Sequence, residues 1–162
     1  MAMGQGPLAF LMRLIALGAT ISATLVMVTA RDSATVLNLT FDAKYTNSPS
    51  FEYFVIANAI ASAYSLVILF LPSKFSFWRL VLILDIVVSV LLDSSISVAL
   101  AIGYVGKKGN EHAGWLPVCG QVPKFCNHIA GAMASGFVAA LLYFVLVIYS
   151  LRSFLILVPQ KP

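Results

Sequence analysis

Two aspartates lie within residues 80–102, a stretch that is otherwise apolar or hydroxyl-bearing. Asp85 and Asp93 are eight positions apart in this stretch, which as a helix is just long enough to cross a hydrocarbon layer of about 30 Å. An ionised carboxylate there costs free energy unless a cation or water neutralises it. The chemistry open to such residues is an interhelical ion pair, a hydrogen bond from a protonated carboxyl, or a proton or cation relay.

Arg13 is the cation that matches Asp85 in depth. Arg13 lies six residues past Pro7, and Asp85 lies six past Arg79, so each is about 9 Å along its helix at about 1.5 Å per residue. Alternatively, Arg13 snorkels to the lipid head groups and water reaches Asp85 from the same side. Because an aspartate is too short to snorkel, we favour an Arg13–Asp85 pair, within one subunit or between subunits, with a role in assembly.

Asp93 lies deeper and has a serine one turn away on either side. The spacing of Ser89, Asp93 and Ser97 predicts a polar intramembrane stripe. One interpretation is a protonated aspartate that is hydrogen-bonded to these serines or to a neighbouring helix. The other is a proton or cation relay, which makes a small four-span transporter or channel, with a polar path around Asp93, the alternative function.

The two cysteines, Cys119 and Cys126, share one polar segment. They predict a disulfide if this segment faces an oxidising compartment, whereas a zinc site would need two further ligands from the scattered His112 and His128. We favour the disulfide and predict no metal. The sequence has no nucleophile motif, phosphate-binding loop or metal-ligand cluster, so we predict no catalytic residue, no cofactor and no enzymatic activity.

The composition indicates the environment in which most of this chain folds. Of its 162 residues 60% are hydrophobic and only 10% charged, and the mean hydropathy is +0.96, which predicts an integral membrane protein. The net charge of +4 is spread over short segments without a basic block, which argues against nucleic acid as a partner.

Four apolar runs predict an all-α bundle of four transmembrane helices in a single domain. The predicted helices span residues 8–30, 52–71, 79–103 and 127–158, and segments 31–51, 72–78 and 104–126 connect them. The first run also ends like a signal peptide, but its apolar part is longer than a signal core. Small residues four apart predict close helix packing, at Gly18 and Ser22, Ala57 and Ala61, Ala59 and Ala63, and Gly131 and Ser135.

The charges on the two sides do not decide the orientation, because each side carries five lysines or arginines. Asn38 begins an Asn-Leu-Thr glycosylation sequon, within a segment whose alternating residues 35–41 could form a short strand or hairpin arm. The sequon and the cysteine pair both favour the outside for segments 31–51 and 104–126. This orientation leaves both termini and segment 72–78 in the cytoplasm.

Several motifs together resemble one plant family. They are LMRL at residues 11–14, PSFEYFVIA at 49–57, Leu84-Asp85, Gly109-Asn110, Trp115-Leu116-Pro117-Val118-Cys119, and Phe125-Cys126. On these residues the chain resembles the Casparian strip membrane domain protein-like (CASP-like) family, which is related to the four-span MARVEL membrane proteins. The extracellular loop motif with Trp115, Leu116 and Pro117 is the most specific of them.

The resemblance implies a multi-pass plasma-membrane protein with cytoplasmic termini. The family's membrane-embedded arginine and aspartate fall on Arg13 and Asp85, and its paired loop cysteines on Cys119 and Cys126. Strip-forming members build immobile polymeric platforms that recruit wall-modifying enzymes, including lignin-forming peroxidases. The implied partners are therefore the lipid bilayer, homo- or hetero-oligomers of family members, and extracellular enzymes. Because Asp93 and segment 31–44 depart from the strip-forming members, we expect a general member of the family.

Overall fold

Four long helices make up most of the residues that the computed structural model describes, which are 6–36, 39–71 and 78–157. They are α1 (Pro7–Thr29), α2 (Pro49–Phe70), α3 (Trp78–Lys108) and α4 (Pro123–Leu157). Each has a stretch that is long and apolar enough to cross a membrane. The predicted class, an all-α integral membrane bundle of four transmembrane helices, is confirmed.

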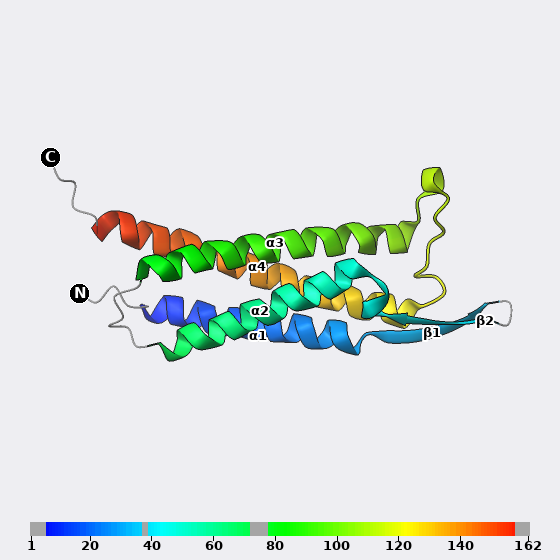
Figure 1. Cartoon of the computed structure of the whole chain (residues 1–162), viewed down its shortest axis with the longest axis horizontal. Coiled ribbons are helices and arrows are strands. Elements are labelled where there is room, and N and C mark those ends of the chain that lie inside the picture. Colours follow the sequence, from blue (N-terminus) through cyan, green and yellow to red (C-terminus); the bar gives the residue numbers. More distant parts are fainter. Residues whose placement is uncertain (1–5, 37–38, 72–77, 158–162) are drawn as a thin grey trace.

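The helices lie side by side, with the start of α1 and the end of α4, the two described termini, at the same end of the bundle (Figure 1). Helix α1 packs against α2 and α4, and α3 packs against the same two helices. Helices α1 and α3 therefore lie on one diagonal of the bundle and run in the same direction. Helices α2 and α4 form the other diagonal.

Helices α3 and α4 extend beyond the positions at which the fall in hydropathy along the sequence predicts their ends. Helix α3 continues to Lys108, and α4 already begins at Pro123, so the connection between them is shorter than the predicted segment 104–126. A proline at the first position, as in α4, is compatible with the start of a helix. Lys107 and Lys108 lie in the last turn of α3, where their positive charges interact favourably with the negative end of the helix dipole. Hydropathy follows the apolar residues, whereas the helical structure continues into the more polar residues at these two ends. Of the predicted connection 72–78, residues 72–77 lie outside the described residues.

A β-hairpin follows α1. Strand β1 (Arg31–Val36) pairs antiparallel with β2 (Leu39–Lys44), from Arg31 opposite Lys44 to Val36 opposite Leu39, and a short 3₁₀ helix, η1 (Tyr45–Asn47), leads into α2. The hairpin extends away from the helices at the end opposite both termini (Figure 1). The stretch 35–41, expected to form a short strand or hairpin arm, is divided in the structure between the end of β1 and the start of β2.

The interior of the bundle contains many small residues, which let the helices approach closely. At the hairpin end, alanines of α1, α3 and α4 pack beside larger side chains; the buried cluster is Ala23, Met27, Ala30, Phe51, Phe54, Ile96, Ala99, Ile129 and Ala132. Large apolar side chains on all four helices point outward and are exposed. An apolar exterior of this kind is the one that lipid requires.

Two helical glycines provide a matched test of this packing. A Cβ on Gly136 would lie 2.6 Å from two ring atoms of the buried Phe54, whereas one on Gly18 would meet nothing within 4 Å. We expect Gly136→Ala to lower the free energy of unfolding by about 1 to 3 kcal/mol through overpacking, and Gly18→Ala to cause no loss. Thermal unfolding in detergent measures both, and equal shifts in the two variants would contradict the packing described.

Candidate functional site

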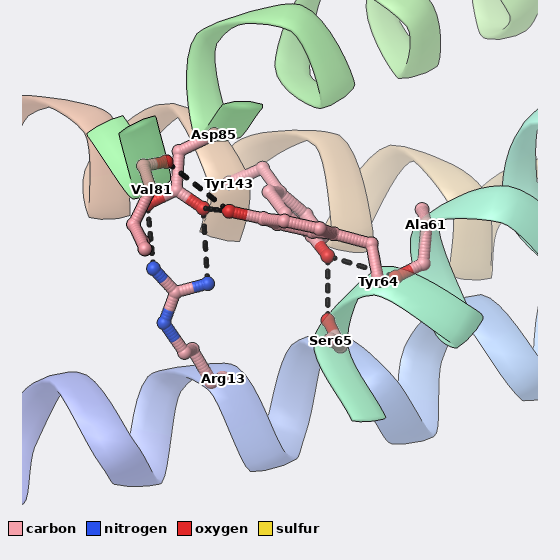
Figure 2. Close-up of polar contacts among 7 residues, drawn as sticks. All are labelled: Arg13, Ala61, Tyr64, Ser65, Val81, Asp85 and Tyr143. Carbon is pink, nitrogen blue, oxygen red and sulfur yellow. Dashed lines mark hydrogen bonds and ion pairs between the residues drawn. The ribbon is translucent and has the colours of Figure 1, made fainter. Parts of the chain in front are cut away.

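An ion pair between Arg13 of α1 and Asp85 of α3 lies in the interior of the bundle (Figure 2). The guanidinium Nη1 donates to Asp85 Oδ1 at 3.0 Å, and Nη2 donates to Oδ2 at 2.5 Å. The two side chains are 2% and 0% exposed. Because α1 and α3 lie on a diagonal, this bidentate pair crosses the bundle within one subunit. Of the arrangements left open by the sequence, the structure has the intramolecular one.

Helix α2 supplies a further donor to the carboxylate. The Tyr64 hydroxyl lies 2.7 Å from Asp85 Oδ1 and 3.2 Å from the Val81 carbonyl oxygen. A hydroxyl has one proton to donate, and the charged carboxylate is the stronger acceptor. Asp85 therefore accepts hydrogen bonds from two different helices, and the Val81 carbonyl is a second acceptor within reach of Tyr64.

Helix α4 contributes Tyr143 to the same cross-section of the bundle. Its hydroxyl donates to the Ala61 carbonyl oxygen at 3.0 Å and accepts from Ser65 Oγ at 2.5 Å, and its ring centre lies 6.5 Å from that of Tyr64. All four helices thus meet in one cross-section (Figure 2). We call this set the central polar layer; its members are Arg13, Tyr64, Ser65, Asp85 and Tyr143.

The two tyrosines of the central polar layer are not among the site residues that the sequence patterns predict. Tyrosines near the ends of membrane spans are typical of the lipid–water interface, which gives no reason to expect them in the interior. A signal is nevertheless present, because Tyr64 lies seven residues before Leu71. Counted from that end of the bundle, this is close to the depth of Arg13 and Asp85. A comparison of polar residues by depth on all four helices would include it.

The central polar layer connects all four helices through hydrogen bonds and one ion pair. It has one cation and one anion, and the described residues contain no cluster of three or more histidine, cysteine or acidic side chains that could hold a metal. A buried ion pair adds little net stability, but the loss of either member leaves a buried charge without a partner. An arrangement that mismatched the helices would leave such a charge unpaired and would therefore be disfavoured.

Ser89, Asp93 and Ser97 do not form one stripe. Ser89 is buried, whereas Asp93 and Ser97 are exposed on the outside of the bundle, where Ser97 Oγ donates to the backbone oxygen of Asp93 at 2.7 Å. Four residues exceed a 3.6-residue turn by about 40°. Counted from the buried Asp85, each step of four therefore moves the side chain further from the interior.

The cysteines lie at the hairpin end of the bundle. Cys119 and Cys126 are joined by a disulfide, and the described residues contain no free cysteine that could serve a zinc site. Both His112 and His128 are exposed. Asn38, the glycosylation candidate, lies outside the described residues.

The Trp115-Leu116-Pro117 motif lies in an exposed part of the same connection. Backbone hydrogen bonds pair Asn110 with Trp115 in both directions, at 2.8 and 2.9 Å. The turn depends on Gly109, which has a φ of 73°. A Cβ added at this position would lie 2.6 Å from the Trp115 carbonyl oxygen. Glycine is thus required there, and the motif is held out from the helices.

These features define a four-span membrane bundle with an internal polar layer, and comparison with known proteins gives its family. The sequence model of the Casparian strip membrane protein domain matches residues 4–142. CASP-like protein 1C1 of Vitis vinifera is 62% identical over 145 residues, which is 90% of this chain and 91% of that protein. CASP-like protein 1C1 of Arabidopsis thaliana is 54% identical over 142 residues, 88% and 87% of the two chains. The chain therefore belongs to the Casparian strip membrane protein family. No solved structure matches it.

Proposed function

We propose that this protein is a plasma-membrane scaffold that assembles laterally, with copies of itself or with other family members, and so organises a membrane patch. Its surface beyond the membrane is the candidate platform for wall-modifying enzymes. The proposal rests on one observation: some of the small residues spaced four apart are buried inside the bundle, whereas others are exposed on its outside.

Small residues on the outside of the bundle are not used by packing within the chain. Ala57 and Ala61 of α2 are buried, but Ala59 and Ala63 on the same helix are exposed. On α1, Gly18 and Ser22 are both exposed as well. In a bilayer, small residues four apart let a second helix approach closely. These faces are the ones we assign to contacts between subunits.

The central polar layer suits a subunit of such an assembly. Because Arg13, Asp85, Tyr64 and Tyr143 link all four helices inside one chain, each subunit can present fixed outer faces to its neighbours. We place both termini in the cytoplasm, with the hairpin and the disulfide-bonded connection outside. The disulfide supports this orientation, since such bonds persist in oxidising compartments.

The alternative function, a transporter or channel with a path around Asp93, has less support. The Asp93 side chain is exposed on the outer face of α3, and Ser89 is buried. A path through the bundle would need these groups on one interior face.

Photobleaching of a C-terminally tagged copy in the plasma membrane of a plant cell tests the scaffold. We expect discrete patches with slow recovery, and a recovery several-fold faster for Gly18→Leu with Ser22→Leu, since bulk on this face separates neighbouring subunits. Val87→Leu with Val90→Leu, at two exposed positions of α3 that carry no small residue, is the control and should recover like the wild type. Rapid, uniform recovery of the wild-type protein would argue against a scaffold.

A further inference from the structure

A cavity of about 810 Å³ lies at the end of the bundle opposite the termini. Its walls come from the β-hairpin, the start of α2, the end of α3, and the disulfide-bonded connection with the first turns of α4. This volume is within the range of small-molecule sites. The central polar layer and the outer faces assigned to assembly contribute nothing to it.

The cavity exists because its walls carry small residues. Ala34 and Ala43 line it from the hairpin, Gly103 and Gly106 from α3, and Ala130 from α4. A Cβ on Gly103 would lie 3.0 Å from the Met133 side chain, so a larger residue there would move Met133. Cys119 and Cys126 both line the cavity and are bonded to each other. One wall is therefore held by a covalent bond.

The inner part of the cavity is apolar. Phe51, Val122 and Ile129 line it and are at most 5% exposed. Phe125 packs edge-to-face against Phe51, with ring centres 6.4 Å apart. Aromatic and aliphatic walls of this kind favour a ring system or a short hydrocarbon chain.

The charged residues of the lining leave an excess of positive charge. Lys44, Lys107 and Asp42 line the cavity, and Lys44 Nζ lies 3.4 Å from Asp42 Oδ2. Lys107 forms no ion pair with any residue in the described part of the chain. An ammonium group beside an apolar cavity, without a carboxylate of its own, favours an acidic head group.

We propose that this cavity binds an anionic amphiphile, with its apolar body against Phe51 and Ile129 and its acidic head at Lys107. The shared chemistry fits two sources, which are a membrane lipid with an anionic head group and a soluble aromatic or aliphatic acid. The site is separate from the assembly faces and does not depend on the scaffold proposal.

The test uses the full chain in nanodiscs of neutral phosphatidylcholine. Naphthalene-2-sulfonate is the probe, and naphthalene-2-sulfonamide is its uncharged counterpart; saturation-transfer NMR titrations give both dissociation constants. We expect the sulfonate to bind at least fivefold more tightly. Lys107→Gln should remove most of this preference, whereas Lys108→Gln, the same change one residue further along α3 and outside the lining, should stay within twofold of wild type.

Filling the cavity should abolish binding of both probes. Ala130→Trp does so from α4, and Ala43→Trp does so from the hairpin, in case the first variant misfolds. Equal affinity for the two probes, equal effects of the two lysine variants, or full binding in both tryptophan variants would overturn the proposal. Phosphatidylglycerol in the nanodisc distinguishes the sources, because a lipid occupant competes with the sulfonate, whereas with a soluble occupant the added lipid leaves sulfonate binding unchanged.

Discussion

Asp85→Asn should destabilise the folded bundle by about 3 to 5 kcal/mol, because it leaves the Arg13 guanidinium buried without a counter-charge. The substitution keeps the size of the side chain, so the loss reports charge and not packing. Arg13 is only 2% exposed, and its Nε already lacks a hydrogen-bond partner. Water is therefore poorly placed to replace the carboxylate.

Asp93→Asn is the matched control, since it makes the same chemical change on the same helix. Asp93 is exposed, whereas Asp85 is fully buried, so we expect the control to remain within about 0.5 kcal/mol of wild type. Thermal unfolding in detergent and the amount of protein that reaches the plasma membrane both measure the effect. If the two variants lose stability equally, the central polar layer does not have the role assigned to it.

Removing both charges should restore much of the loss. Arg13→Met with Asp85→Leu leaves no buried charge, and the Tyr64 hydroxyl still has the Val81 carbonyl oxygen within 3.2 Å. We expect this double variant to be more stable than Asp85→Asn alone. The charge swap, Arg13→Asp with Asp85→Arg, should be partly rescued relative to either of its single changes. A swap no better than its single variants would contradict a direct pair.

The depth of polar residues along each helix can be predicted from sequence, because a helix rises by a fixed distance per residue. Counting residues from the helix ends is therefore enough to match Arg13 with Asp85. The four spans follow from hydropathy alone. Which way a side chain faces is a different question, because it depends on how each helix is rotated. The spacing of serines predicts Asp93 in a polar stripe with Ser89, yet Asp93 lies on the outside of the bundle.

Other features depend on contacts between segments that are distant in sequence. The hydrogen bond from Tyr143 to Ala61 joins residues 82 positions apart, and no local sequence pattern predicts it. The cavity at the hairpin end likewise needs Ala34, Gly103 and Ala130 to meet from three different elements. Small residues in each segment suggest close packing, and only their arrangement in space shows that at these positions they leave a cavity.

Loss of the disulfide should loosen the hairpin end of the molecule and leave the membrane bundle intact. Cys119 and Cys126 are seven positions apart, and closing a loop of this size is worth roughly 2 to 3 kcal/mol by chain entropy. The bond joins α4 to a connection that is itself tied to α3, because the backbone N–H groups of Val118 and Cys119 lie 2.9 and 3.1 Å from the Gly106 carbonyl oxygen.

Hydrogen exchange of the Cys119→Ser, Cys126→Ser variant should therefore rise across residues 103–130 and stay unchanged around Arg13 and Asp85. Reduction of the wild-type protein should reproduce this pattern, and reduction of the double-serine variant should add nothing to it. Mass spectrometry of the non-reduced, alkylated protein should show the two cysteines linked. An increase in exchange spread evenly over all four helices would mean that the bundle depends on the disulfide. The central polar layer would then be insufficient to hold the four helices together.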